Sequence, residues 1–260
     1  MRDAVAAYLD WWEEAGVLDA VGKEATNWFA HGNSGRGPAS VARVAPVPPV
    51  SVPFKTPPRP APADDPRARD LVAQAGTLDE LHGLLKGFEG CGLRATAKNL
   101  CFYRGSPRAR LMLIGEAPGR DEDLAGKPFV GRAGQLLNRM LSAIGLDESK
   151  VHIANTVYWR PPGNRTPTPE ETAACAPFLT RQMELVDPSV VVLLGGVAAK
   201  SVLGLTDGIL KLRGKWRSLA IAGREVRTLA TLHPAYLLRT PAAKRQAWQD
   251  LLLIDAALRG

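Results

Sequence analysis

The chain has 260 residues, a formal net charge of +7 and only three cysteines. No apolar run approaches the roughly 18 residues that a membrane-spanning helix requires. This composition argues against a disulfide framework and predicts a cytoplasmic protein with no secretory signal. The length suits one sizeable α/β domain with a small appendage.

The first part of the chain is predicted to stand apart from that domain. Residues 1–32 show helical patterns in which Tyr8, Trp11 and Trp12 contribute to an apolar stripe. Residues 33–69 contain ten of the 21 prolines, which is typical of an extended linker. We expect a tethered helical segment whose tryptophans either bind a partner protein or pack on the main domain, which is assigned to residues 70–260.

Apolar runs and helical patterns alternate through the main domain. The predicted strands are residues 110–115, 151–157, 189–195 and 226–232, and the predicted helices are residues 133–145, 169–186, 197–203 and 242–259. This alternation indicates an α/β fold with three layers, α/β/α, around a central four-stranded, mainly parallel sheet. A glycine-punctuated basic region before the fourth strand is compatible with a short hairpin.

Polar residues gather where the predicted strands end. Glu116 follows the first strand, Asn155 lies at the end of the second, and His233 follows the fourth. Ligands of parallel sheets bind beyond the carboxyl ends of the strands, so these side chains are expected to share one site. Phe129, in the long loop after the first strand, offers an aromatic face. The combination predicts a site that reads a planar heterocycle.

Positive charge is concentrated in residues 205–247, which carry nine basic and two acidic residues. The rest of the chain is balanced in charge. Such a local excess suits a polyanion such as a nucleic-acid backbone, and a solvated basic face is the alternative.

Several long motifs in the main domain are shared with one family. They are GEAPG at 115–119, GKPFVG at 126–131, GQLL at 134–137, RPPGNRTP at 160–167 and HPA at 233–235. On these motifs the chain resembles the family 4 uracil-DNA glycosylases, from about residue 88 to the predicted C-terminal helix. The resemblance implies a mixed α/β/α fold and the removal of uracil from DNA, which begins base-excision repair.

The resemblance also implies roles for residues around the base. A uracil flipped out of the DNA would stack on Phe129, pair its O4 and N3–H with the Asn155 side chain, and place O2 near His233. Glu122 and Glu116 are the carboxylates that could hold the attacking water or stabilise the sugar cation, and the family favours Glu122.

Ala117 is expected to border the uracil. A related glycosylase family has a water-activating aspartate at the similar position, and Ala117 has no polar group. The group that activates the water therefore stays open at this point.

Contacts to the DNA itself are expected from two places. By resemblance Arg160 and Arg165 would bind phosphates, which position the protein without reading sequence. The residues directly after the HPA motif, Tyr236, Leu237, Leu238 and Arg239, are candidates for the DNA interface, with an apolar wedge filling the space that the flipped base leaves. Burial of the two leucines in the core is the alternative.

The cysteines depart from the family pattern. Family members usually hold a [4Fe–4S] cluster on four cysteines. Cys91 and Cys175 match two of these positions, whereas Arg94 and Trp159 occupy the other two. We therefore expect no cluster and no metal. We also expect Trp159 to fill the cluster's volume, Arg94 to form a cation–π contact across its ring, and Cys101 to be a small buried residue.

Two other functions remain open from the sequence. The chain could remove another deaminated base, such as hypoxanthine or xanthine, or it could bind uracil or abasic sites without turnover. If the protein is a uracil-DNA glycosylase, uracil-containing DNA is its expected partner. The protein is expected to be a monomer.

Overall fold

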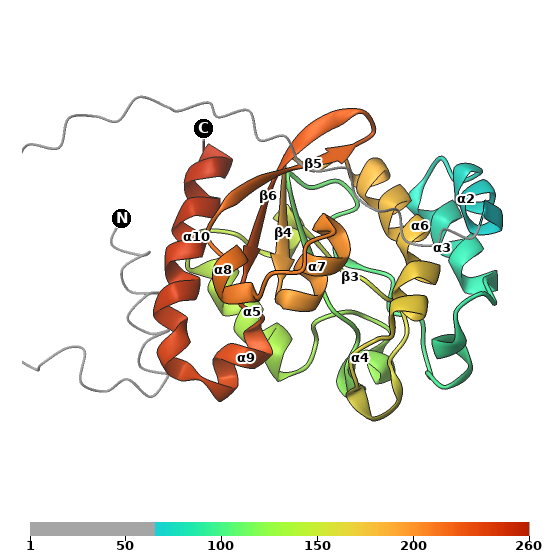
Figure 1. Ribbon diagram of the computed structural model, residues 1–260, viewed down its shortest axis with the longest axis horizontal. Coiled ribbons are helices and arrows are strands. Elements are labelled where there is room, and N and C mark those ends of the chain that lie inside the picture. Colours follow the sequence, from blue (N-terminus) through green and yellow to red (C-terminus); the bar gives the residue numbers. More distant parts are fainter. Residues whose placement is uncertain (1–65, 260) are drawn as a thin grey trace, which may run out of the picture.

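The computed structural model describes residues 66–259 (Figure 1). The predicted helical segment 1–32 and nearly all of the predicted linker lie outside the described residues. The first described helix, α2 (Pro66–Ala73), already includes the last residues assigned to the linker, because proline is compatible with the first turn of a helix. No helix in this described part is long and apolar enough to cross a membrane.

One sheet forms the centre of the described domain, with the strand order β1-β3-β2-β4-β6-β5. Its strands are β1 (Arg104–Gly105), β2 (Leu111–Gly115), β3 (Val151–Asn155), β4 (Val190–Leu194), β5 (Trp216–Ile221) and β6 (Arg224–Thr231). The four inner strands, β3, β2, β4 and β6, run parallel, and an antiparallel strand closes each edge. The predicted α/β class and the four inner strands are confirmed, but the sheet has six strands within residues 66–259, not four.

The two edge strands lack the pattern that identifies the inner ones. β1 has two residues, which is too short to show any period. β5 is only partly buried along most of its length, so it does not read as an apolar run. It pairs with β6 through a two-residue turn in which Ala222 and Gly223 both have positive φ, at 48° and 78°. This is the turn geometry that matches the twist of a tight hairpin.

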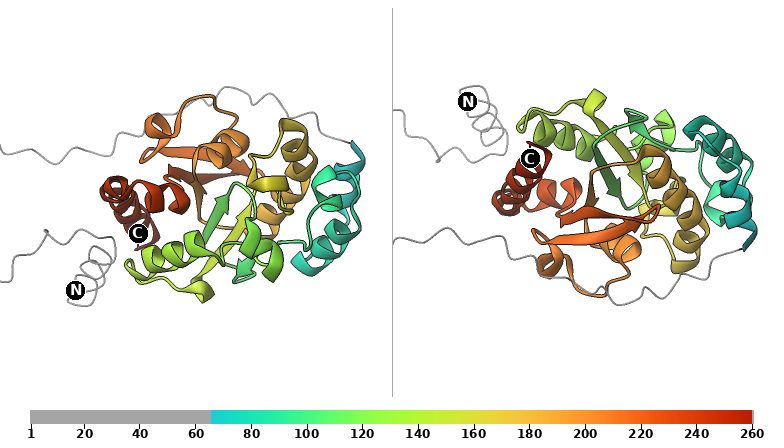
Figure 2. Two further views of the ribbon diagram at one scale, coloured as in Figure 1. Left: turned by 90° about the horizontal axis from the view of Figure 1, so that it is seen from below. Right: turned by 90° about the horizontal axis from the view of Figure 1, so that it is seen from above.

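Helices cover both faces of the sheet (Figure 2). Besides α2, the described α-helices are α3 (Leu78–Gly87), α4 (Arg120–Ala125), α5 (Arg132–Ser142), α6 (Pro169–Val186), α7 (Gly196–Leu203), α8 (Ile209–Leu212), α9 (Pro234–Arg239) and α10 (Lys244–Arg259). The prediction of 169–186 coincides with α6, and the predictions for α5, α7 and α10 differ from the structure by one to three residues at their ends.

Alternation along the inner strands divides the buried residues into two cores. Met112 and Ile114 of β2 point into a core with α6 and α7, and α2 and α3 pack outside α6. Leu111 and Leu113 point the other way, into a core with α5, α9 and α10. Side chains of a strand alternate between faces, so an apolar residue at every position requires a cover on both sides.

The parallel strands bring their carboxyl ends to one edge of the sheet. Gly115 at the end of β2 is in register with Asn155 at the end of β3, and Leu194 of β4 is in register with Thr231 of β6. The loops that leave these strands therefore meet at that edge.

Candidate active site

A cavity of about 480 Å³ opens at the carboxyl edge of the sheet. The sequence-predicted residues that line it are Glu116, Ala117, Glu122, Phe129, Arg165, His233 and Arg239. They come from the segments that follow β2, β3 and β6, which are distant in sequence. The structure thus brings together most of the predicted site, whereas the cavity wall does not include Asn155, Arg160, Leu237 or Leu238.

Asn155 is not part of the cavity wall, but it lies next to the Phe129 ring that lines it, and its amide is buried. Its side chain is 1% exposed, and neither Oδ1 nor Nδ2 has a hydrogen-bond partner within the described part of the chain. A Cβ built on Gly115 would lie 2.5 Å from Asn155 Oδ1 and 2.5 Å from the Phe129 ring. The amide is therefore next to the ring. Buried polar groups are nearly always paired, so an unpaired amide at a cavity is a site for a ligand with a donor and an acceptor.

Phe129 is held in an unusual backbone conformation. Its φ is 56°, in the left-handed region that favours glycine. Gly134 permits this arrangement, since a Cβ there would lie 1.7 Å from the Phe129 carbonyl oxygen. The Phe129 ring stacks on His233, with centroids 5.5 Å apart and planes at 30°. Strain of this kind persists where the surroundings fix it, which is common at functional sites.

Hydrogen bonds to Glu122 hold the loop that carries Phe129 in place. Its Oε1 accepts hydrogen bonds from the N–H groups of Val130 and Gly131, each at 2.9 Å. Its Oε2 accepts from the N–H of Gly119 at 3.1 Å. A carboxylate has about four acceptor positions, so Glu122 is largely occupied by backbone groups. Its role in holding the water stays a prediction, and its hydrogen bonds in the structure are those of a positioning residue.

Glu116 is the other carboxylate of the cavity, and it is partly exposed. Its main chain is fixed, because Thr156 Oγ1 donates to the Glu116 carbonyl oxygen at 2.6 Å. Sequence reasoning missed Thr156, since a threonine after a strand carries no special pattern. Ala117 lies beside Glu116 in the cavity wall and leaves space there.

His233 presents one defined face to the cavity. It is the N-cap of α9, and its Nδ1 accepts the N–H of Ala235 at 3.1 Å. The neutral ring therefore carries its proton on Nε2. Burial, and to a smaller extent the charge of Arg239, lower the pKa of His233 to about 4. His233 is thus a neutral donor at physiological pH. Gly195 lets the ring approach, since a Cβ there would lie 3.1 Å from the His233 Cβ.

The predicted DNA contacts divide into exposed and buried residues. Arg239 is exposed at the cavity, and Arg160 Nε donates to Asn164 Oδ1 at 2.7 Å at its border. Leu238 is 38% exposed, whereas Leu237 is 0% exposed and lies in the core with α5 and α10. The expectation that Leu237 contacts DNA is therefore wrong, because a short helix buries every third or fourth residue. Tyr236, 37% exposed, lines the cavity instead.

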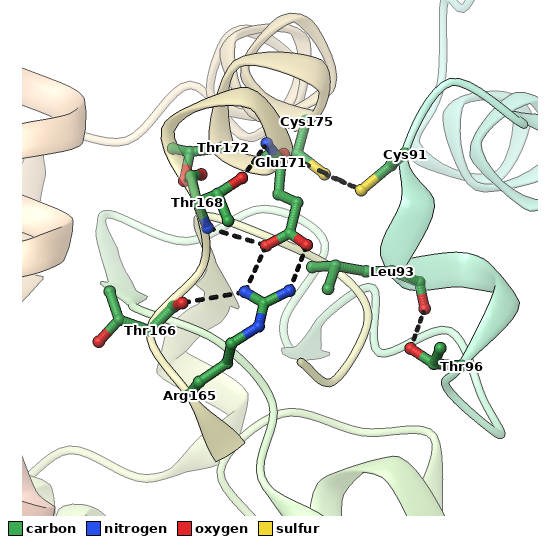
Figure 3. A network of polar contacts seen from close by, with 9 residues as sticks. All are labelled: Cys91, Leu93, Thr96, Arg165, Thr166, Thr168, Glu171, Thr172 and Cys175. Carbon is green, nitrogen blue, oxygen red and sulfur yellow. Dashed lines mark hydrogen bonds and ion pairs between the residues drawn. The ribbon is translucent and has the colours of Figure 1, made fainter. Parts of the chain in front are cut away.

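Arg165 is engaged in an ion pair (Figure 3). Its Nη1 and Nη2 donate to the two carboxylate oxygens of Glu171, at 2.8 and 2.6 Å. The hydrogen bond from Arg165 is the main cause that lowers the pKa of Glu171. Thr168 adds its N–H at 2.8 Å. Together these bonds fix the loop after β3 to the first turn of α6.

Two buried thiols lie beside this network (Figure 3). The Cys175 S–H donates to Cys91 Sγ at 3.8 Å. This bond lowers the pKa of Cys91 and raises the pKa of Cys175 well above its usual value. Cys101 is separately engaged, donating its S–H to the Glu122 carbonyl oxygen at 3.1 Å. It is buried, as expected, and burial is the main cause that raises its pKa to about 12.

Trp159 and Arg94 have different surroundings. Trp159 is 3% exposed and packs in the core that contains both Cys91 and Cys175. Arg94 is partly exposed and donates to the Phe88 carbonyl oxygen and to Glu89. The expected cation–π contact between Arg94 and Trp159 is wrong: within residues 66–259 the only such contact places Arg227 over Trp216.

The cavity combines features that suit one kind of ligand. An aromatic ring and an unpaired amide can hold a flat heterocycle with adjacent donor and acceptor groups. A neutral histidine donor can stabilise negative charge that develops on the ring. A carboxylate and exposed arginine provide sites for water and for phosphate.

Comparison with known proteins identifies the class to which this site belongs. Residues 102–252 match the family described as the Uracil DNA glycosylase superfamily, so the chain belongs to that superfamily. It is 40% identical over 178 residues to the Type-4 uracil-DNA glycosylase of Archaeoglobus fulgidus, a match that covers 67% of this chain and 89% of the relative. Within the superfamily the chain is therefore a member of the type-4 uracil-DNA glycosylases.

Other relatives of the same type are equally similar. The Type-4 uracil-DNA glycosylase of Pyrobaculum aerophilum is 40% identical over 180 residues, which cover 68% of this chain and 92% of the relative. That of Thermotoga maritima is 42% identical over 159 residues, which cover 60% and 80%. The family resemblance drawn from the sequence motifs is confirmed.

Proposed function

We propose that this protein removes uracil from DNA by hydrolysing the N-glycosidic bond, which leaves an abasic site and begins base-excision repair. The buried, unpaired amide of Asn155 beside the Phe129 ring is the observation that carries the proposal. Uracil offers O4 as an acceptor and N3–H as a donor on one edge. A single carboxamide can meet both, whereas cytosine presents a different pattern there.

The chemistry follows from the charge that the reaction creates. When the bond between C1′ and N1 breaks, its electron pair moves to the uracil ring and positive charge develops on the sugar. Nε2–H of His233 stabilises the anion near O2, as a donor in an oxyanion hole does. Water then bonds to C1′ and gives a proton to a carboxylate of the site, and the uracil anion takes up a proton from solvent. The products are free uracil and an abasic deoxyribose.

We further propose that Glu116 holds the attacking water and that Glu122 acts by positioning. Glu122 already accepts three backbone hydrogen bonds. Glu116 lines the same cavity and is partly exposed. Its carboxylate is therefore the better placed of the two to take a proton from water and to face the sugar cation.

Strand scission tests the proposed reaction. The full chain is incubated with labelled oligonucleotides that carry uracil, thymine, hypoxanthine or xanthine, and abasic sites are then cleaved with alkali. We expect scission only with uracil. A gel shift with uracil DNA but no scission would assign a binding protein, and faster scission with hypoxanthine or xanthine would assign a different deaminated base. The cavity's intact carboxylate and histidine argue against the first of these alternatives.

Paired substitutions separate the two carboxylates. Glu116→Gln is expected to lower kcat by at least about a hundredfold and to leave the melting temperature unchanged. Glu122→Gln removes a charged acceptor from three N–H groups, so it should lower stability by about 1.5–3 kcal/mol, which is a fall in Tm of several degrees. Single-turnover kinetics and thermal unfolding measure both. The reverse pattern, with Glu122→Gln stable and inactive, would contradict the assignment.

We also propose that the protein carries no iron–sulfur cluster. Such clusters need four thiolates, and the described residues include three cysteines, of which Cys101 is bonded to the Glu122 carbonyl oxygen. Cys91 and Cys175 bond to each other, and the bulky Trp159 packs in the same core. These contacts do not fit a four-iron group. Ordinary packing and the Arg165–Glu171 pair would then hold the loop after β3 against α6 without a cluster.

Iron analysis tests this proposal directly. The purified full chain, prepared without oxygen, is expected to be colourless and to contain far less than one iron per molecule. Titration with a thiol reagent after unfolding should find all three cysteines reduced. Stoichiometric iron together with broad visible absorbance would overturn the proposal.

A further inference from the structure

A seam between α5 and α10, on the opposite side of the second core from the sheet, has the features of a binding surface. The two helices lie beside each other (Figure 2). At the far end of the seam, a groove of about 520 Å³ lies between the residues that follow α5 and the last turn of α10. This groove is distinct from the active-site cavity, since the two share no lining residue.

One face of α10 runs along the seam. It carries Lys244, Trp248, Leu252, Asp255 and Arg259, which are three or four residues apart and therefore lie above one another on a helix. Leu252 is 47% exposed, so a large apolar side chain is accessible in the middle of this face. Trp248 is partly buried against the core beneath it. The face is thus apolar in the middle with a basic residue at each end.

Positive charge borders this apolar middle at both ends. At the active-site end are Lys244, the first residue of α10, which is largely buried, and Arg139 of α5, and both have interaction partners within the protein. At the groove, Arg108, Arg110 and Lys150 are exposed around a floor that includes Leu146.

The acidic groups that face the groove do not balance this charge. Asp255 pairs with Arg259 at 2.8 Å, and Asp147 with Lys150 at 3.4 Å. Lys150 also donates to the Gly145 carbonyl oxygen at 3.0 Å. Within the described residues, Arg108 and Arg110 have no carboxylate partner in hydrogen-bond contact. The groove therefore suits a partner that supplies both apolar and acidic groups.

The first residues of this chain have that chemistry. Residues 1–19 carry five carboxylates and one arginine, together with Tyr8, Trp11 and Trp12. As a helix, this segment would place Ala4, Tyr8, Trp11 and Trp12 on one stripe, with the carboxylates of Asp3, Asp10 and Glu14 along one border. Acidic groups beside an aromatic stripe complement basic groups beside an apolar one.

The length of the connecting chain allows this contact. Residues 16–65 separate residues 1–15 from the described domain, and the stretch 33–65 alone is long enough to span on the order of 30 Å or more. The domain itself has a radius of gyration of about 16 Å. The segment can therefore reach the seam from the start of α2, and tethering raises its local concentration to about the millimolar range.

We propose that residues 1–15 dock as an amphipathic helix along the seam between α5 and α10, with Trp11 and Trp12 against Leu252 and Trp248. The occupant is the chain's own N-terminus and not a separate protein. Bound there, the helix covers the exposed Leu252 side chain and brings carboxylates to the exposed Arg108 and Arg110 at the groove.

Hydrogen exchange of the full-length protein tests the proposal. In the wild type, amides of residues 1–15 and of α10 should be protected. Leu252→Asp puts a negative charge in the seam, and it should speed exchange in residues 1–15 by at least about tenfold, which is roughly 1.4 kcal/mol of docking free energy. The matched control is Leu210→Asp, since Leu210 is 66% exposed on α8 and outside the seam.

A second variant acts from the other side of the contact. Trp11→Ala with Trp12→Ala leaves the described domain unchanged and should speed exchange in α10 without lowering uracil release. Free exchange of residues 1–15 in the wild type, or protection that Leu252→Asp and Leu210→Asp change equally, would overturn the proposal. Protection that rises with protein concentration would assign the seam to a second copy, and protection lost on adding DNA without uracil would assign it to nucleic acid. Both outcomes also overturn it.

Discussion

Asn155→Ala is expected to lower kcat/KM for uracil release by at least about a hundredfold, or 2.7 kcal/mol of barrier, without lowering the stability of the free protein. The Asn155 amide is buried, and it forms no hydrogen bond with any group of residues 66–259. An unpaired buried polar group costs about 1–3 kcal/mol, and the substitution removes that cost while it opens only a small space. Truncation of a buried residue normally lowers the stability of a protein. A loss of activity without a loss of stability would therefore identify Asn155 as a residue that binds the substrate.

Single-turnover kinetics on a uracil oligonucleotide and thermal unfolding give the two readouts. Asn138→Ala is the matched control, because Asn138 is an exposed amide on α5 that accepts a hydrogen bond from Arg104 at 2.6 Å, outside the cavity wall. It should keep full activity. A loss of activity below tenfold in Asn155→Ala would mean that the amide does not read the base.

His233→Ala should reduce kcat by about 10²–10³, which corresponds to the loss of one preorganised donor worth about 2.7–4 kcal/mol. The pH dependence gives a sharper test. The pKa of His233 is lowered to about 4, so the ring stays neutral from pH 8 down to about pH 5. The wild-type kcat should therefore not fall as the pH is lowered through 6.5, which is the ordinary pKa of histidine.

The lowered pKa of His233 also makes the stability of the folded protein depend on pH. A histidine with a depressed pKa is protonated more readily in the unfolded state, so its contribution to stability is lost as pH falls from about 6.5 toward 4. His82→Ala, at an exposed position of α3, is the control for loss of an imidazole. An acid limb near pH 6.5 that disappears in His233→Ala would show that the charged ring is the working form.

Much of this architecture was accessible from the sequence because the inner strands carry a strong signal. β2 and β4 are apolar at nearly every position, which only a sheet covered on both faces explains. That topology predicts that Glu116, Asn155 and His233 meet at one edge, and the structure places them there. The edge strands β1 and β5 were less accessible, since one is two residues long and the other is mostly half-exposed.

The details that sequence did not provide depend on contacts between distant segments. Two neighbouring leucines after the HPA motif look alike, but only the packing of α9 on α5 buries Leu237 and exposes Leu238. Two carboxylates in one loop also look alike. The two carboxylates differ because the backbone N–H groups of Val130 and Gly131 donate hydrogen bonds to Glu122 in the folded chain. Such choices are made by tertiary hydrogen bonds, which have no local pattern.

The ion pair of Arg165 affects how strongly salt concentration changes the affinity of this protein for DNA. Binding of each phosphate by a free cation releases condensed counterions, and the logarithm of affinity falls with the logarithm of salt concentration at a slope of about −0.9 per phosphate on B-DNA. Both terminal nitrogens of Arg165 are already bonded to Glu171. A phosphate there would exchange one anion for another, so Arg165 should contribute little to that slope although it lies at the mouth of the cavity.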